Sequence, residues 1–223
     1  SVIGCVDSDS IYKVPLELEK EKIDQVVVRN LGLRKRKNKL KDWIKYTSII
    51  DSKGLPSVNI GIVGKYNLLS DSYLSVVESI KHASAANNCR ATIVWVNAEN
   101  LEKSDSMDAL KNLDGILIPG GFGDRGIEGK IKAAKYAREN NIPYFGLCLG
   151  MHIAVIEFAR HVAGMEDANS TEFSRDCTFP VIDILPDQKK VRQKGGTMRL
   201  GAYPCQNRPQ TKLYEAYQCE TVS

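Results

Sequence analysis

Apolar positions follow two different spacings from about residue 57 onward. Short runs rich in β-branched residues predict four strands, Val58–Val63, Ala91–Val96, Gly115–Pro119 and Ile142–Leu147. Helical spacing predicts four helices, at about Ser72–Ala86, Ser106–Asn112, Glu128–Asn140 and from the fourth strand to about Ala163. Ser70 or Asp71 would cap the first helix, and Gly164 would end the last one. Strands and helices that alternate at these lengths predict an α/β fold with a doubly wound, mostly parallel sheet, in which ligands bind at the carboxyl ends of the strands.

The same spacing predicts which side of the last two helices packs on the sheet. One helix carries a single apolar face, made of Ile127, Ile131, Ala134 and Ala137. For the helix after the fourth strand we expect an inner face of five residues, Met151, Ala154, Val155, Phe158 and Val162.

The first 56 residues lack this alternation. A strand-like run at Val2–Val6 and a charged helix at about Leu16–Gln25 cannot close a hydrophobic core by themselves. We therefore predict three parts, with residues 1–30 as the C-terminal end of one domain, 31–56 as a basic interdomain linker and 57–223 as a second domain. Late in the chain we expect β-like segments at Phe179–Leu185 and Lys189–Gln193 and a helix near Lys212–Tyr217.

The composition is that of an ordinary globular protein, with 43% hydrophobic and 26% charged residues among 223. No apolar run approaches the roughly 20 residues that span a bilayer, and the N-terminus does not read as a signal peptide. Six cysteines without a C-x-x-C pair argue against a zinc site and a disulfide framework. Reduced thiols favour a cytoplasmic protein with no metal and no membrane partner.

The net charge of +4 has a local source. Residues 34–41 hold six basic side chains and no acidic one. Because no aromatic residues are interleaved with them, a solvated linker or helix face explains the run better than a nucleic-acid site.

A cysteine lies where the fourth strand turns into its helix. Gly146 and Gly150 flank Cys148 to give G-x-C-x-G, the cysteine form of a nucleophile elbow. Small neighbours allow the tight turn, and the positive end of the helix favours a thiolate. The alternative is a buried structural cysteine.

A glycine-rich loop at residues 120–126 follows the third strand and allows two interpretations. Gly121, Gly123 and Gly126 match a dinucleotide fingerprint, which would make the protein a nucleotide-binding oxidoreductase, but the acidic residue expected about 20 positions later is absent. The other interpretation is an oxyanion hole, in which loop N–H groups face the oxygen of a tetrahedral intermediate above Cys148.

Several motifs identify a family. The runs P-G-G-F-G-x-R-G at 119–126 and G-x-C-L-G-M at 146–151 are similar to those of class I glutamine amidotransferases, whose fold is a flavodoxin-like sheet. Four more runs resemble the CTP synthase family, DSIYKVP at 9–15, VGKY at 63–66, DANSTEF at 167–173 and GGTMRLG at 195–201. The resemblance extends over essentially the whole chain.

The resemblance implies a glutamine-hydrolysing ligase of pyrimidine nucleotide biosynthesis. Cys148 would attack the side-chain amide of glutamine, form a glutamyl thioester and release ammonia to the synthase domain of the same polypeptide, where ATP and Mg²⁺ activate UTP. Gly121 and Leu149 would form the oxyanion hole, and Glu172 would suit the substrate's ammonium group. Glutamine would contact Gly121, Leu149, Gly150, Met151, His152 and Glu172. The allosteric activator GTP would approach Lys65, Arg125 and Arg199. The family implies a cytoplasmic homotetramer.

Two departures accompany the resemblance. The family's His-x-Glu pair, which supplies the base, would lie beyond residue 223, so we expect the amidotransferase domain to be truncated at its C-terminus. His152 replaces the family's usual glutamine. The i,i+4 pairs Glu78/His82 and Glu157/His161 are expected to be solvated. A non-catalytic regulatory or scaffold fragment that binds glutamine or GTP is therefore an alternative.

Overall fold

We describe the protein from a computed structural model, which covers residues 2–34, 40–65, 70–185, 188 and 201–223. Its central sheet has four parallel strands, β1 (Ser57–Gly64), β2 (Arg90–Asn97), β3 (Gly115–Ile118) and β4 (Tyr144–Gly146), in the order β2-β1-β3-β4. β1 pairs with β2 along its whole length, and β3 joins β1 to β4. All four overlap the predicted runs, which confirms the α/β class with a doubly wound parallel sheet.

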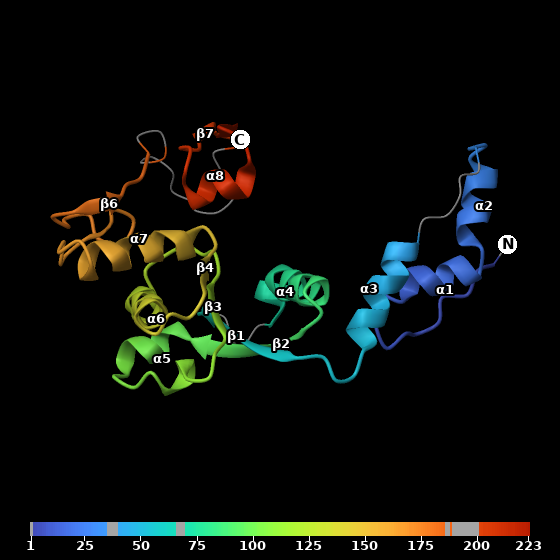
Figure 1. Ribbon diagram of the computed structural model, residues 1–223, viewed down its shortest axis with the longest axis horizontal. Coiled ribbons are helices and arrows are strands. Elements are labelled where there is room, and N and C mark those ends of the chain that lie inside the picture. Colours follow the sequence, from blue (N-terminus) through green and yellow to red (C-terminus); the bar gives the residue numbers. More distant parts are fainter. Residues whose placement is uncertain (1, 35–39, 66–69, 186–187, 189–200) are drawn as a thin grey trace.

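Helices cover both faces of the sheet (Figure 1). A 3₁₀ turn, η1 (Ser70–Tyr73), leads into α4 (Leu74–Ala86) on one face, and α5 (Ala98–Lys103), α6 (Ile127–Glu139) and α7 (Leu149–His161) lie on the other. The side chains of β3 divide accordingly, since Leu117 lines the α4 side whereas Ile118 joins the core formed with α6 and α7.

The helix predicted after β2 was misplaced. Residues 98–103 form α5, whereas the expected segment 106–112 holds only a 3₁₀ turn, η2 (Asp108–Leu110). The Asn97 side chain accepts a hydrogen bond from the N–H of Asn100, and this N-cap starts the helix directly at the end of the strand.

The main hydrophobic core lies between the sheet and α5–α7. Ile116, Ile118, Ile153 and Ile156 are among its fully buried side chains. α6 buries its predicted face of Ile127, Ile131, Ala134 and Ala137. The close approach of α5 to α6 requires Gly129, because a Cβ there would overlap the carbonyl group of Ala98.

The predicted inner face of α7 was wrong. α7 buries Leu149, Ile153, Ile156 and Ala159, whereas Met151, Val155, Phe158 and Val162 are 50%, 39%, 55% and 49% exposed. We call these four exposed residues the outer stripe. The helix carries two apolar stripes that both fit a helical period, so the period could not decide which one faces the sheet.

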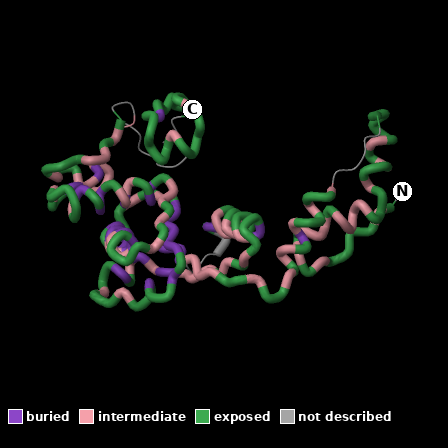
Figure 2. Tube along the Cα trace, in the orientation of Figure 1, coloured by how far each residue is buried: buried purple, intermediate pink, exposed green. Residues whose placement is uncertain are grey.

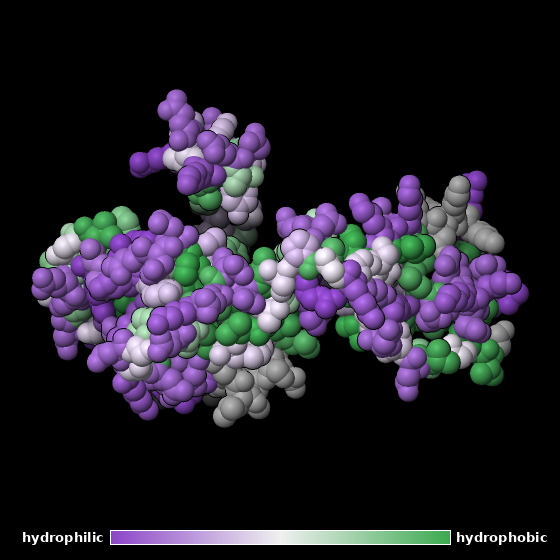
Figure 3. All heavy atoms as spheres, turned by 60° about the horizontal axis from the view of Figure 1, so that its bottom comes forward, coloured by the Kyte–Doolittle hydropathy of each residue, from purple (hydrophilic) through white to green (hydrophobic). Residues whose placement is uncertain are grey.

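Other apolar side chains also reach the surface, seen as green areas among hydrophilic residues in Figure 3. A groove of about 350 Å³ remains beside α4 on its face of the sheet, and Ile80, Ala83, Leu117 and Phe145 are among its lining residues. Phe145 is 62% exposed. α4 therefore covers that face incompletely over β3 and β4.

Three helices precede the sheet, α1 (Val14–Lys20), α2 (Ile23–Asn30) and α3 (Lys41–Asp51). α1 and α2 have no buried residue and α3 buries only Thr47 (Figure 2). The single helix predicted at 16–25 was wrong, because Lys22 takes a left-handed φ of 60° and separates α1 from α2. Residues 2–6 pair with no described strand, contrary to the expected strand. α3 lies inside the segment that we predicted to be a linker.

An aromatic cluster attaches this N-terminal part to α4. The Tyr12 hydroxyl donates to the Glu78 carboxylate and lies 2.8 Å from Nε2 of His82. Trp43 of α3 donates from Nε1 to the Tyr12 carbonyl at 2.8 Å. Glu78 and His82, which we expected to be a solvated pair, instead hold the N-terminal segment on α4.

The chain after α7 forms small elements. β5 (Asn169–Ser170) pairs in parallel with β6 (Pro180–Ile182), and β7 (Cys205–Gln206) pairs antiparallel with β8 (Thr221–Val222). α8 (Lys212–Tyr217) confirms the helix predicted there, β6 is a short part of the expected β-like segment 179–185, and the expected segment 189–193 lies outside the described residues. In the part of the chain that the structure describes, no helix is long and apolar enough to cross a membrane.

Candidate active site

The turn between β4 and α7 has the strained geometry of a nucleophile elbow. Cys148, the N-cap of α7, has φ 51° and ψ −102°, a conformation that residues with a Cβ rarely adopt. Its side chain is exposed. The structural alternative of a buried cysteine is therefore wrong for this residue.

Gly146 and Gly150 make the turn possible. A Cβ at Gly146 would lie 2.6 Å from the nitrogen of Met151 and would overlap the carbonyl group of Gly150, while a Cβ at Gly150 would overlap the carbonyl oxygen of Ile118. The hydroxyl of Tyr144 donates to the Gly150 carbonyl at 2.6 Å, and burial raises the pKa of this phenol. β3, β4 and α7 are thus packed backbone to backbone below the cysteine.

The glycine loop lies directly beside the elbow. A Cβ at Gly120 would be 3.6 Å from Cβ of Cys148, and one at Gly121 would be 3.6 Å from Cδ2 of Leu149. The N–H groups of Gly121 and Leu149 donate to no backbone oxygen of a described residue. N–H groups without such an acceptor beside an exposed thiol would suit an oxyanion hole.

Two of the three predicted GTP contacts lie at this loop. Lys65, which follows β1, donates from Nζ to the carbonyl of Phe122 within the loop. Arg125 is exposed and lies 3.5 Å from a carboxylate oxygen of Glu99 on α5. Arg199 lies outside the described residues.

His152 and Glu172 come together near the elbow. His152 lies one helical turn after Cys148, and its N–H donates to the Cys148 carbonyl at 3.2 Å. Burial lowers the pKa of the His152 imidazole, and the negative charge of Glu172 partly opposes this effect. Glu172 lies in the turn after β5, where its N–H donates to Oγ of Ser170 at 3.2 Å. The structure therefore places Gly121, Leu149 and His152 around Cys148, with Glu172 close enough for its charge to act on His152.

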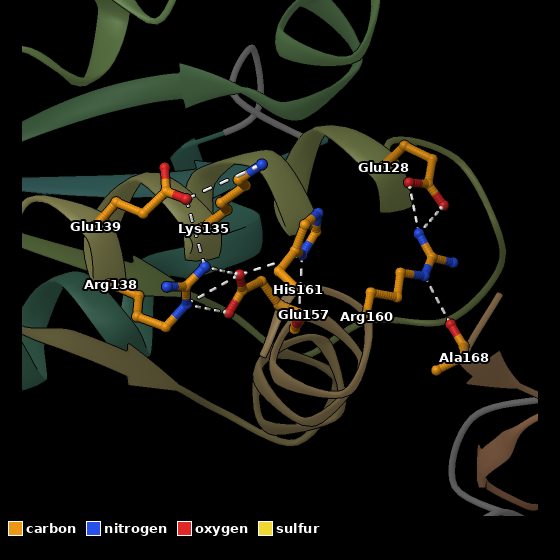
Figure 4. A network of polar contacts seen from close by, with 8 residues as sticks. All are labelled: Glu128, Lys135, Arg138, Glu139, Glu157, Arg160, His161 and Ala168. Atoms are coloured by element: carbon orange, nitrogen blue, oxygen red, sulfur yellow. Dashed lines mark hydrogen bonds and ion pairs between the residues drawn. The ribbon is translucent and has the colours of Figure 1, made fainter. Parts of the chain in front are cut away.

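Glu157 and His161 are part of a clamp between α6 and α7, in which Glu157 is buried and His161 is not (Figure 4). Glu157 is 3% exposed and accepts hydrogen bonds from Nε and Nη2 of Arg138 at 3.1 Å and 2.8 Å. This carboxylate raises the pKa of Arg138. His161 lies 3.2 Å from the same carboxylate. The expectation of a solvated pair was wrong, because Arg138, 19 positions away in sequence, covers Glu157.

Sequence reasoning missed a second ion pair between these helices. Arg160 of α7 donates from Nη1 to both carboxylate oxygens of Glu128 at 3.0 Å and 2.9 Å, and from Nε to the Ala168 carbonyl at 2.7 Å (Figure 4). Glu128 and Arg160 are 32 positions apart, so no local pattern links them.

Among the described residues, no group of three or more His, Cys, Asp or Glu side chains could hold a metal ion. The groups that the structure does place around the elbow are an exposed thiol and the N–H groups of Gly121 and Leu149.

Comparison with known proteins connects this geometry to a family. The family described as "Glutamine amidotransferase class-I" matches residues 68–223. The chain is 54% identical over its whole length to a CTP synthase of Carboxydothermus hydrogenoformans and 45% identical to that of Bacillus subtilis. It is also 50% identical, over 97% of its length, to the CTP synthase of Methanocaldococcus jannaschii. The chain spans 41% of the length of each of these relatives.

A solved structure has the same fold. The glutaminase domain of Trypanosoma brucei CTPS with bound acivicin is 36% identical, with a TM-score of 0.59 over 74% of this chain and 64% of that one. These similarities favour the amidotransferase interpretation of the glycine loop over the dinucleotide-binding one.

Proposed function

The chain belongs to the class I glutamine amidotransferase family, and we propose that Cys148 hydrolyses the side-chain amide of glutamine. The observation that carries this proposal is the exposed thiol at a residue of positive φ, beside two N–H groups that donate to no backbone oxygen of a described residue. The sulfur attacks the amide carbon, and the N–H groups of Gly121 and Leu149 stabilise the resulting oxyanion. Collapse of this intermediate breaks the C–N bond, so that ammonia leaves and a glutamyl thioester remains. Water then hydrolyses the thioester to glutamate and restores the thiol.

The residues around the thiol would hold the amino-acid part of the substrate. Glu172 offers a negative charge to the ammonium group of glutamine, and Gly121 with residues 149–152 surrounds the side chain. Because Gly150 is buried and its carbonyl accepts from Tyr144, its contribution is to shape the site rather than to bind through that oxygen.

Only one of the three histidines is near the thiol. His82 contacts Tyr12 on the α4 side of the sheet, and His161 lies at the far end of α7, about 18 Å along the helix axis from its start. Among the histidines of this chain, His152 is therefore the candidate for the base that moves the thiol proton to the leaving ammonia, whereas the family resemblance implies a His-x-Glu pair for this role.

For the longer protein we propose the CTP synthase reaction, supported by the similarity to CTP synthases over the whole chain. Ammonia would pass to a synthase domain of the same polypeptide, where ATP and Mg²⁺ activate UTP, and this part of the chain would need no cofactor of its own. GTP would act as the allosteric activator, with Lys65 and Arg125 beside the glycine loop and Arg199 proposed from sequence alone. We further propose a cytoplasmic homotetramer.

Glutamine hydrolysis tests the proposal. Ammonia release would be measured for the 223-residue chain, for a longer polypeptide that continues past residue 223, and for each with Cys148→Ala. We expect the longer form to be active and Cys148→Ala to abolish its activity.

The remaining outcomes separate the alternatives. Activity of the 223-residue chain itself, lost in His152→Gln, would assign the base to His152. A longer form that binds glutamine without releasing ammonia would contradict the proposal and support a regulatory or scaffold role.

A further inference from the structure

Three separate segments carry the proposed glutamine site. The glycine loop runs into α6, the elbow runs into α7, and the turn with Glu172 follows β5. The distances between these segments must hold to within a fraction of an ångström for substrate, thiol and oxyanion donors to meet. A side chain that belongs to one of these segments and forms hydrogen bonds to the other two can set these distances.

Arg160 is placed to do this. It belongs to the last turn of α7, and its side chain is only 15% exposed. Its guanidinium binds Glu128 near the start of α6 through Nη1 and the Ala168 carbonyl just before β5 through Nε (Figure 4). A planar guanidinium with fixed donor directions holds two such partners at a defined angle.

Both partners of Arg160 lie a few residues along the chain from a part of the proposed site. Glu128 is the second residue of α6, two positions after Gly126, the last residue of the glycine loop. Gly126 has φ 71°, and a Cβ there would lie 3.0 Å from Cβ of Ala98. On the other side, the fully buried Ala168 leads through β5 to Ser170, which is 1% exposed and accepts from the N–H of Glu172.

We propose that Arg160 is a positioning residue for glutamine, which fixes the glycine loop and Glu172 relative to the helix of Cys148. This inference rests on the proposed function. Arg160 does not touch the substrate, so its loss should loosen the binding geometry and raise KM, with a smaller effect on kcat through Gly121, the proposed oxyanion donor on the same loop.

The structure offers a matched control. Arg138 also joins α6 to α7, through Glu157, but the contacts of this clamp involve neither the glycine loop nor the Glu172 turn. Loss of Arg138 should therefore weaken the helix packing without moving the site. Arg138→Met and Arg160→Met each replace an arginine of the α6–α7 interface by an unbranched apolar side chain.

Steady-state glutaminase kinetics of the glutamine-hydrolysing form of the protein test the proposal. For Arg160→Met we expect KM for glutamine to rise about tenfold with kcat changed less than about threefold. Arg160→Lys should recover only part of this loss, because an ammonium cannot bind both partners in the same plane. Arg138→Met should lower the melting temperature and leave KM within about twofold.

A second variant covers the case in which Arg160→Met does not fold. Glu128→Gln removes one arm of the contact at a half-exposed carboxylate and should raise KM about two- to threefold. Product formation with added ammonia in place of glutamine should be unchanged in every variant, because ammonia bypasses the site.

Three results would overturn the inference. These are an unchanged KM in Arg160→Met and Glu128→Gln, a fall in kcat alone, or an equal rise of KM in Arg138→Met. Each is distinct from failure of the proposed function, in which the unaltered protein would release no ammonia from glutamine.

Discussion

The backbone of Gly150 lies against the carbonyl of Ile118, so that a Cβ at residue 150 would be 3.1 Å from the carbonyl carbon and would overlap its oxygen. Through this contact the first turn of α7 rests directly on the end of β3. The two segments that meet here carry the thiol and the start of the glycine loop.

Gly150→Ala should destabilise the protein. Alanine in a helix interior is normally favoured over glycine by about 1 kcal/mol, but the new methyl group would have to displace the backbone of β3. We expect the clash to outweigh the propensity and to lower the free energy of unfolding by about 1–3 kcal/mol, measured by urea denaturation. Gly4→Ala is the control, because a Cβ there meets nothing within 4 Å. Equal stability of the two variants would contradict the contact.

Lys130 should make stability depend on pH. It is 2% exposed, and its side chain has no hydrogen bond or ion pair with a described residue. Burial together with the charge of Lys65 lowers its pKa from 10.5 to about 8. Between these two values the folded state binds fewer protons than the unfolded state, so the free energy of unfolding rises with pH in that window. A shift of this size corresponds to on the order of 3 kcal/mol.

Lys130→Met should remove this dependence and stabilise the protein below pH 8, where the buried ammonium is charged. Chemical denaturation at pH 7 and pH 10 measures both effects. Lys135→Met is the control, because its side chain is 41% exposed and lies 4.0 Å from Glu139. We expect that control to stay within about 0.5 kcal/mol at both pH values. A parallel pH response of Lys130→Met and the unaltered protein would sink the prediction.

Tyr12→Phe should loosen the N-terminal part from α4. A phenol has one proton, and Tyr12 gives it to the Glu78 carboxylate, so Nε2 of His82 must donate to the Tyr12 oxygen. Phenylalanine removes both hydrogen bonds, so the partly buried carboxylate of Glu78 loses the one from the phenol. We expect the free energy of unfolding of this part to fall by about 1–3 kcal/mol. The fluorescence of Trp43 reports the change, because its ring lies 6.1 Å from that of Tyr12. Tyr203→Phe, at a 60% exposed site, should have no measurable effect.

Cys148 should be alkylated much faster than the other five thiols. It is exposed at the N-cap of α7, beside the N–H groups that stabilise negative charge. Peptide mass spectrometry after brief iodoacetamide treatment near pH 7 should show at least about tenfold preference for Cys148. Cys5 and Cys205, which are also exposed, serve as internal controls. Similar labelling of the three would argue against an activated thiol.

The sheet and the elbow could be predicted because local patterns determine them. β3 is an uninterrupted apolar run, and β1 and β2 are mostly apolar apart from residues such as Asn59 and Thr92. The spacing of Gly146, Cys148 and Gly150 allows few backbone conformations at the elbow. The elements that escaped prediction depend on single residues or distant partners. A lysine at position 22 gives no sign of a left-handed φ, and α5 owes its start to one asparagine cap.

The proximity of Gly121 and Leu149 could be expected for the same reason, because they follow β3 and β4, two strands that pair in the sheet. Their proposed roles stay a prediction. Glu128, Arg160 and Lys130 gave no signal, since their roles depend on burial and on contacts far along the chain. The outer stripe of α7 shows the limit of prediction from periodicity. Two apolar stripes fit the helical period equally well, and only tertiary packing determines which of them is buried.

The positive φ of Cys148 also restricts which nucleophiles this fold can reach by substitution. Serine, cysteine and threonine all serve as attacking side chains in enzymes, and serine differs from cysteine only at the γ atom. Threonine adds a methyl group on Cβ, and β-branched residues are outliers at φ near 51°. The backbone at residue 148 can therefore accept serine as a replacement nucleophile. It disfavours threonine by its conformation, independently of the chemistry that threonine could perform.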